Sequence, residues 1–283
     1  MDDVVFILNP HSSNGKIQPI KDEILKFNPS AKCYVSESIE QMNIFIDEVF
    51  EDTQIFVAIG GDGTISTVAQ RLINTDKILA IFPAGSGNGF SRETHFEKNF
   101  KQLFDKIKNR KSQKIDSFLV NDHFSINVSG TGFDGKVVKE FEKTNRGFQN
   151  YIRVTLQTFF SYKPIKVTFH TSGFEKFDGE YLMLNVANTR QFGNNAYIAP
   201  TADFSDGKLD VVLVKKFPVH YSALFAYRMF TKKLKDDDYI QYLSVGELEF
   251  SVDTTDWHID GEFRKIPSPV RVKVQRESLR ILV

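Results

Sequence analysis

The residues best suited to chemistry form a glycine-rich string, GGDGT at residues 60–64, which follows an apolar run and precedes a stretch with helical spacing. Glycine lets the backbone take positive φ and approach a ligand closely. The N–H groups at the start of a helix attract an anion such as phosphate. A carboxylate beside phosphate needs a bridging cation, so Asp62 points to a nucleotide with Mg²⁺. The alternative is an ordinary strand–helix turn in which Asp62 serves as a cap.

Other polar or glycine-rich loops also follow apolar runs. Residues 82–89 (FPAGSGNG) repeat the glycine pattern, with Ser86 and Asn88 as neutral hydrogen-bonding side chains, and residues 9–16 (NPHSSNGK) are polar. Loops that leave neighbouring parallel strands form one crevice at the carboxyl edge of the sheet, where open α/β sheets bind ligands. The strings GxxxxGK[ST] and GxGxxG are absent from the sequence, which excludes a standard P-loop and a dinucleotide fingerprint.

Carboxylates near the end of the chain are candidates for acid–base work. Residues 256–262 (DWHIDGE) place Asp260 and Glu262 around a glycine. Transfer of a phosphoryl group to an alcohol needs a carboxylate that accepts the hydroxyl proton, and either residue could serve. The alternative is a plain hairpin turn. Residues 203–208 (DFSDGK) are equally ambiguous, either a turn or a carboxylate with carbonyls that bind a hard cation.

Apolar runs predict the strands that carry the first loops. The first half of the chain alternates short apolar runs with stretches in which apolar residues recur every three or four positions, as in strands joined by amphipathic helices. Such alternation predicts a doubly wound parallel sheet. The expected strands are 4–8, 55–59 and 78–82, and the expected helices lie around 39–50, 68–73 and 96–107.

The pattern changes after about residue 115. The segments that alternate polar and apolar residues are 123–128, 165–169 and 248–252, and helical spacing persists at 149–161 and 219–233. Alternation of this kind predicts antiparallel strands with one buried face. We therefore expect an α/β domain over residues 1–116 and a β-rich domain over 117–275, with a last strand, 276–283, able to pair with either. A cleft between the domains is the expected ligand site.

Composition excludes several classes of protein. The 283 residues include 36 Lys and Arg and 36 Asp and Glu, and this zero net charge argues against a nucleic-acid binder that relies on a bulk basic field. The single cysteine, Cys33, excludes an intramolecular disulfide and a cysteine-based zinc cluster. No apolar run approaches the roughly 20 residues of a spanning helix, and the acidic start is unlike a secretory signal. We expect a cytoplasmic location.

Taken in order, these motifs resemble the diacylglycerol kinase catalytic family, which includes sphingosine and ceramide kinases and soluble bacterial lipid kinases. The matches fall in the family's order over nearly the whole chain, which is more specific than any one loop. The segments that carry the resemblance are residues 9–16, 60–64 (GGDGT), 83–88 (PAGSGN), 124–134 (FSINVSGTGFD), 185–210 and 260–262 (DGE).

The resemblance implies an α/β nucleotide domain followed by a β-sandwich-like domain, with the active site between them. It implies an ATP- and Mg²⁺-dependent transfer of phosphate to the hydroxyl group of a lipid presented by a membrane. Glu262 would take the proton from that hydroxyl, and Asp62 would organise the phosphates and Mg²⁺. The implied nucleotide contacts are Asn9, Ser36, Gly60, Gly61, Asp62, Gly63, Thr64, Ser86 and Asn88.

A structural Mg²⁺ is a second implication of the resemblance, because some bacterial members of the family carry one. Asp206, with the backbone carbonyls of Asp203 and Lys208, would bind this ion. A water molecule would link it to Asp116.

Departures from the family pattern leave the acceptor open. The family often continues GGDGT-x-N-E, where this chain has Ser66 and Thr67, and many bacterial members have an acid where this chain has Gly89. The acceptor could therefore be diacylglycerol-like or sphingoid-like. An NAD kinase-like phosphotransferase is an alternative, because that family also carries GGDGT. A nucleotide-binding regulatory module without catalysis is another.

The apolar helix expected near residues 219–230 lies beside the basic run 232–235 (KKLK). A solvated helix face explains this pattern most simply, since Asp236 and its neighbours follow directly. The alternative is transient contact with an anionic membrane surface. The sequence leaves the oligomeric state open, a homodimer included.

Overall fold

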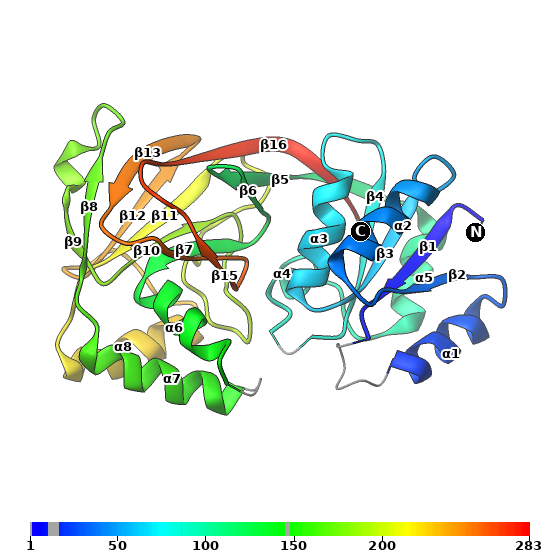
Figure 1. Cartoon of the computed structure of the whole chain (residues 1–283), viewed down its shortest axis with the longest axis horizontal. Coiled ribbons are helices and arrows are strands. Elements are labelled where there is room, and N and C mark those ends of the chain that lie inside the picture. Colours follow the sequence, from blue (N-terminus) through cyan, green and yellow to red (C-terminus); the bar gives the residue numbers. More distant parts are fainter. Residues whose placement is uncertain (1, 11–16, 86, 145–147) are drawn as a thin grey trace. The chain divides into compact units, whose positions relative to one another are not determined.

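The computed structural model describes residues 2–10, 17–85, 87–144 and 148–283 (Figure 1). The chain divides into two compact units. Unit 1 consists of residues 1–116 and 276–283, and unit 2 consists of residues 117–275. The last strand of the chain, β16 (Val270–Leu282), therefore contributes residues to both units.

Unit 1 is built on a parallel sheet in the order β2-β1-β3-β4-β16. Its strands are β1 (Val4–Leu8), β2 (Lys32–Val35), β3 (Ile55–Gly60) and β4 (Ile78–Pro83). Every residue of β1, β3 and β4 is buried, as expected for parallel strands that are covered on both faces. Arg280 and Ile281 of β16 pair in parallel with β4, which shows that the last strand of the chain completes this sheet.

Helices connect the strands of unit 1. They are α1 (Ile17–Phe27), α2 (Ile39–Val49), α3 (Asp62–Leu72), α4 (Gly89–Glu93) and α5 (Phe100–Asn109). Polar side chains fix where two of them begin: Ser38 accepts a hydrogen bond from the N–H of Gln41, and Asn99 accepts one from the N–H of Gln102. α2 contacts α3, and α1 contacts α5 (Figure 1). The strand–helix alternation confirms the predicted α/β domain.

Unit 2 contains an antiparallel sheet in the order β12-β11-β10-β7-β14-β15. Its strands are β7 (Val128–Gly132), β10 (Met183–Ala187), β11 (Leu209–Val214), β12 (Ile240–Val245), β14 (Asp256–Ile259) and β15 (Glu262–Lys265). Strands β5 (Ser112–Val120), β6 (His123–Ser125), β8 (Ile165–Phe169), β9 (Gly179–Tyr181) and β13 (Glu247–Val252) belong with β16 to the other sheet.

Apolar side chains from both sheets form the main core of unit 2, with Leu184, Phe250 and Trp257 among the fully buried members. This packing of sheet on sheet confirms the predicted β-sandwich-like domain. A second core lies under α6 (Phe133–Phe141), α7 (Phe148–Ser161) and α8 (Val219–Phe230), which lie near one another (Figure 1). In the described ranges, no helix is both long and apolar enough to cross a bilayer.

Candidate functional site

The glycine loops after β3 and β4 meet in unit 1. These strands are parallel neighbours, and Gly60 pairs with Pro83 at their ends. The N–H of Ala84 donates to the carbonyl of Gly60 at 2.8 Å. A Cβ atom on Gly85 would lie only 2.5 Å from the Cα of Gly61, so the close approach of the two backbones requires glycine at position 85. The expected convergence of the two loops at one edge of the sheet is observed.

Asn88 closes the second loop on itself. Its Nδ2 donates to the carbonyl of Gly85 at 2.9 Å, and its Oδ1 accepts from the N–H of Gly85 at 3.0 Å. The residue takes a left-handed conformation with φ of 50°, which asparagine tolerates well. The side chain thus shapes the loop, and its role as a nucleotide contact stays a prediction. Ser86, predicted as another contact, lies outside the described residues.

Asp62 joins the two loops. Its Oδ2 accepts from the N–H of Gly89 and its Oδ1 from the N–H of Phe90, both at 3.2 Å. The carboxylate of Asp62, in the first turn of α3, therefore caps the start of α4. Hydrogen bonds from backbone N–H groups to a carboxylate are strong, because the acceptor is charged. Asp62 holds the start of α4 against the GGDGT string whatever else it binds.

The start of α3 is the part of unit 1 best suited to phosphate. Gly61, at the N-cap position of this helix, provides no capping side chain. The first N–H groups of an α-helix have no partner inside the helix and attract anions. Thr64 in the first turn is buried, and its Oγ1 accepts from Nδ2 of Asn9 at 2.8 Å. Asn9 thereby joins the end of β1 to the same helix.

Ser36, a further predicted contact, follows β2 and is buried. Its N–H donates to the carbonyl of Leu8 at 3.0 Å, and its hydroxyl donates to the carbonyl of Ser38 at 2.6 Å. The carbonyl of Gly63 accepts from the hydroxyl of Thr67 at 2.9 Å. The ends of β1, β2, β3 and β4 thus bring glycine backbone and the uncapped start of α3 together. These residues fit the phosphates of a nucleotide.

In unit 2, the DGE string forms the turn of the β14–β15 hairpin. Ile259 pairs with Glu262, so Asp260 and Gly261 are the two residues of the turn. Their φ angles are 49° and 85°. Two consecutive positive φ angles are typical of a type I′ turn, for which Asp-Gly is a favoured sequence. The interpretation of this string as a hairpin turn is therefore correct. A turn of this kind does not exclude a chemical role for its carboxylates.

The two carboxylates of the DGE string have different surroundings. Asp260 is buried, and it accepts hydrogen bonds from the Ser125 hydroxyl at 2.6 Å and from the N–H groups of Asn127 at 2.9 Å and Ile126 at 3.1 Å. Glu262 keeps 43% of its side chain exposed, and its Oε2 pairs with Nη2 of Arg264 at 2.7 Å. Glu262 is therefore the carboxylate that a substrate could reach, and Asp260 fixes the turn beneath it.

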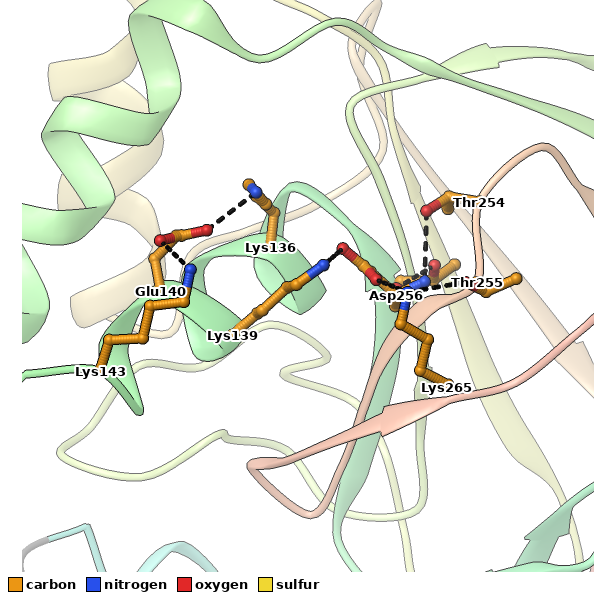
Figure 2. A network of polar contacts seen from close by, with 9 residues as sticks. Lys136, Lys139, Glu140, Lys143, Thr254, Thr255, Asp256 and Lys265 are labelled. Carbon is orange, nitrogen blue, oxygen red and sulfur yellow. Dashed lines mark hydrogen bonds and ion pairs between the residues drawn. The ribbon is translucent and has the colours of Figure 1, made fainter.

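A network of charged residues holds this hairpin on α6 (Figure 2). Lys139 of α6 pairs with Asp256 of β14 at 2.7 Å, and Lys265 of β15 pairs with the same carboxylate at 3.3 Å. Burial alone would raise the pKa of Asp256, but the hydrogen bonds from Lys139 and Lys265 outweigh it and hold that pKa below its usual value. The N–H of Phe263 donates to Oε1 of Glu142 at 3.0 Å.

The same helix carries a second group of charges. Glu140 pairs with Lys136 and Lys143, each at 2.8 Å (Figure 2). Hydrogen bonds from these two lysines lower the pKa of Glu140 to about 2. This group lines an open groove of about 400 Å³ between α6 and α7, together with Arg153. No sequence motif indicated that α6 would support the DGE hairpin. The residues of α6 and of the hairpin that contact one another are more than a hundred residues apart in the chain.

Sequence reasoning also missed a buried polar row beneath these elements. Asn185 of β10 and His258 of β14 both pair in register with Gly130 of β7. Nε2 of His258 lies 3.1 Å from Oδ2 of Asp134. A Cβ atom on Gly130 would collide with the side chains of Asn185 and Asp134.

Several atoms of this row have no hydrogen-bond partner among the described residues. They are Oδ1 and Nδ2 of Asn185 and Nδ1 of His258. Buried polar atoms of this kind are normally satisfied by protein, water or a ligand. The signal in the sequence was the presence of polar residues and glycine within strands that are otherwise apolar.

The residues predicted to hold a structural metal form a local turn. Oδ1 of Asp203 accepts from the N–H and hydroxyl of Ser205 at 2.9 and 2.6 Å, and Oδ1 of Asp206 accepts from the N–H of Lys208 at 2.9 Å. Across the described part of the chain, no group of three or more His, Cys, Asp or Glu side chains is placed to hold a metal ion. The predicted set is smaller, one carboxylate with two carbonyls, and it stays a prediction.

A cation would suit this turn on electrostatic grounds. Burial, followed by the charge of Asp206, raises the pKa of Asp210 to about 6. A nearby divalent ion would relieve the repulsion between these carboxylates. Asp116, the predicted water-linked partner, is buried in unit 1, where its Oδ1 accepts from the N–H of Glu277 at 2.7 Å.

Both halves of the chain match models of known protein families. Residues 3–120 match the model of the diacylglycerol kinase catalytic domain, and residues 127–283 match that of the YegS C-terminal NAD kinase beta sandwich-like domain. A diacylglycerol kinase of Mycobacterium tuberculosis is 31% identical over 59% of this chain, and the match spans 57% of that relative's length. A diacylglycerol kinase of Bacillus subtilis is 25% identical over 77% of this chain and 74% of its own length.

Solved structures share the fold. A diacylglycerol kinase from Bacillus anthracis str. Sterne superposes with a TM-score of 0.75 at 17% identity, covering 99% of this chain and 96% of that chain. Another structure from the same organism reaches a TM-score of 0.79 at 18% identity with the same coverage.

Proposed function

The chain belongs to the diacylglycerol kinase family, and from this premise we propose that it is a lipid kinase. It transfers the γ-phosphoryl group of ATP to the hydroxyl group of a lipid at a membrane surface. The observation that carries the proposal is the interlocking of the two glycine loops, in which Gly61 and Gly85 meet beside the uncapped start of α3. Phosphoryl transfer depends mainly on positioning and charge stabilisation, which such backbone provides.

The residues of unit 1 bind and orient the nucleotide. The N–H groups at the start of α3 hold the phosphates, and Asp62 keeps the second loop in place through its hydrogen bonds to α4. Mg²⁺, when bound, supplies neutralisation of the phosphate charge. The turn at Asp203 and Asp206 is the proposed site of a separate structural ion.

Glu262 is the proposed general base. Its carboxylate accepts the proton of the lipid hydroxyl while the hydroxyl oxygen bonds to the γ-phosphorus and ADP leaves. Arg264, its ion-pair partner, keeps the carboxylate oriented before the substrate arrives. The relatives are named diacylglycerol kinases, so diacylglycerol is the first acceptor to test. Sphingoid acceptors come next because of the GSGN loop.

Replacing Glu262 tests this assignment. Purified full-length protein is incubated with γ-labelled ATP, Mg²⁺ and vesicles that contain diacylglycerol, ceramide or sphingosine. The wild type should label one of these lipids, and Glu262→Gln should lower the rate at least about 100-fold, since general base catalysis contributes about 10²–10⁴-fold. The control is Glu249→Gln, an exposed glutamate of β13 that should leave the rate unchanged.

Other outcomes distinguish the remaining interpretations. An undiminished rate in Glu262→Gln would exclude this residue as the base. Formation of NADP from NAD would favour an NAD kinase-like enzyme. Nucleotide binding without transfer to any acceptor would favour a regulatory module.

A further inference from the structure

Helix α8 presents an apolar face to solvent. Val219 is 60% exposed, Leu224 40%, Tyr227 55% and Phe230 42%. Leu224, Tyr227 and Phe230 follow one another at intervals of three residues, and Val219 lies about three turns before Phe230, so the four side chains share one side of the helix. They make up half of the large apolar side chains that are exposed in the described part of the chain. A surface helix normally turns polar residues outward, so this face has an unusual composition.

The opposite side of α8 is fixed to unit 2. Phe225 is buried and stacks on Phe217, with ring centroids 5.1 Å apart. Arg228 pairs with Asp237 at 2.8 Å, and the hydroxyl of Tyr221 also hydrogen-bonds to this carboxylate. The helix is thus anchored through one face. The apolar side chains on the other face are therefore exposed while the helix is packed in place.

Lysines lie at both ends of this helix. Those exposed just before it are Lys215 and Lys216, and those exposed just after it are Lys232, Lys233 and Lys235. Within the described ranges, none of these lysines forms an ion pair with a carboxylate. Nζ of Lys232 lies 4.4 Å from the ring centroid of Tyr197, and Nζ of Lys216 donates to the carbonyl of Tyr162 at 3.1 Å.

Nearby acidic residues cancel only part of this charge. Asp237 is already neutralised by Arg228, which leaves Asp236 and Asp238 as the exposed carboxylates of the adjoining segment. Five lysines therefore surround the apolar face with a net positive charge. An apolar helix face bordered by lysine is the composition of helices that lie in a bilayer interface, with apolar side chains inserted and ammonium groups beside anionic headgroups.

We propose that the exposed face of α8 and its flanking lysines dock unit 2 on an anionic lipid bilayer. The proposal rests on the proposed function, because a lipid kinase must reach an acceptor held in a membrane. The size of the face favours a bilayer over a second copy of the chain. Twelve residues of helix extend about 18 Å, and a stable protein interface needs about 800 Å² from each partner. Insertion of a few side chains into lipid requires no such area.

Vesicle flotation tests the proposal without nucleotide or acceptor. Full-length protein is mixed with vesicles of phosphatidylcholine alone or of phosphatidylcholine with phosphatidylglycerol, an anionic lipid that attracts basic residues near the surface. The wild type should float with the anionic vesicles and remain behind with the neutral ones. The double variant Lys232→Glu, Lys233→Glu should weaken binding to anionic vesicles at least about tenfold.

A second variant tests the apolar part of the face. The double substitution Leu224→Gln, Phe230→Gln should weaken binding about tenfold or more, because two side chains no longer enter the lipid. The matched control is Ile44→Gln on α2, where a side chain of similar size is 52% exposed. This control should bind vesicles as the wild type does. Circular dichroism verifies that each variant is folded.

The outcomes separate this proposal from the proposed function. Binding that ignores lipid charge, or that survives both α8 variants, would overturn the docking surface. A concentration-dependent dimer that the Leu224→Gln, Phe230→Gln variant abolishes would also overturn it and assign the face to a second copy. Protein that binds vesicles through α8 but phosphorylates no acceptor would contradict the proposed function alone.

Discussion

At positions 62 and 260, aspartate side chains accept hydrogen bonds from backbone N–H groups elsewhere in their own unit. Both lie in strings that first suggested chemistry, and both stabilise loops. Glu262 differs because its carboxylate is partly exposed and pairs with the side chain of Arg264. Asp62 thus shapes the glycine loops of unit 1, Asp260 shapes the hairpin turn of unit 2, and Glu262 keeps an accessible carboxylate.

The contact between the glycine loops yields a prediction. Gly85→Ala should weaken nucleotide binding at least about tenfold and destabilise unit 1 by about 1–3 kcal/mol, because the new methyl group would overlap Gly61 and force the loops apart. Isothermal titration with ATP and urea unfolding measure the two effects. The control is Gly246→Ala, where no atom lies within 4 Å of the added Cβ. Equal behaviour of the two variants would contradict the role given to Gly85.

The two aspartates also show what sequence can predict about such a site. The strings GGDGT and PAGSGN follow buried strands, so their place at one edge of the sheet could be predicted from apolar runs alone. The partners of Asp62 and Asp260 could not, because they lie 27 and more than 130 residues away in the chain. Roles that depend on such distant contacts need coordinates.

Among the elements, α6 links the interior of unit 2 to the candidate base. Its Lys139 reaches Asp256, its Glu142 reaches the backbone of Phe263, and Glu262 precedes Phe263 directly. Lys139 also lies over the ring of Phe263, 5.3 Å from the centroid. The position of Glu262 therefore depends on a helix of which only Phe133 and Asp134 belong to a recognised motif.

Lys139→Met should destabilise the protein by about 1–2 kcal/mol at pH 7 and lower the rate of transfer, since the hairpin loses its ion pair. The folded pKa of Asp256 is lowered, so the ion pair contributes above the unfolded pKa and is lost as the pH falls through the folded value. The stability difference from wild type should thus shrink below about pH 4. Urea unfolding at pH 7 and pH 3 measures it.

Lys143→Met is the control for this experiment. Lys143 lies in the turn after α6 and forms an exposed pair with Glu140, three residues earlier, so its loss should change stability by less than about 0.5 kcal/mol and leave the transfer rate unchanged. A Lys139→Met variant that transfers phosphate at the full rate would contradict the role of α6 in positioning Glu262.

The regular elements followed from the sequence more closely than the irregular ones. Continuous apolar runs predicted β1, β3 and β4, and alternation predicted β8 and β13. The alternation over residues 123–128 indicated β6, although this strand ends at Ser125, whereas β9 has three residues, too few for either pattern to show. The row of Asn185, Gly130 and His258 could not be predicted from the sequence for another reason. Strand pairing brings these residues together from three separate segments of the chain.

In the whole molecule, β16 gives residues to both units. Its first part pairs with β13, while Arg280 and Ile281 pair with β4. Leu279, Ile281 and Leu282 are fully buried in the sheet that carries the glycine loops. The apolar pattern of this segment indicated a strand. It did not indicate which half the strand would join, because a sheet was predicted in both halves.

Ile281→Ala should destabilise unit 1 by about 2–5 kcal/mol, the usual cost of such a truncation in a core. Hydrogen exchange of the β3 and β4 amides should become faster, and ATP should restore part of the protection. Val283→Ala, at a position that is 40% exposed, is the control and should change stability by less than about 0.5 kcal/mol. Unchanged exchange in β4 of the Ile281→Ala protein would contradict this account.

The placement of β16 has a consequence for biosynthesis. A ribosome delivers residues 1–116 first, yet their sheet lacks its last strand until residues 276–283 have been made. At a synthesis rate of about 5–20 residues per second, the edge of β4 stays without its partner strand for roughly ten seconds or more. During that interval nascent unit 1 exposes an unpaired apolar strand, while all the residues of unit 2 become available earlier. The half of the protein translated first is thus the last to be complete.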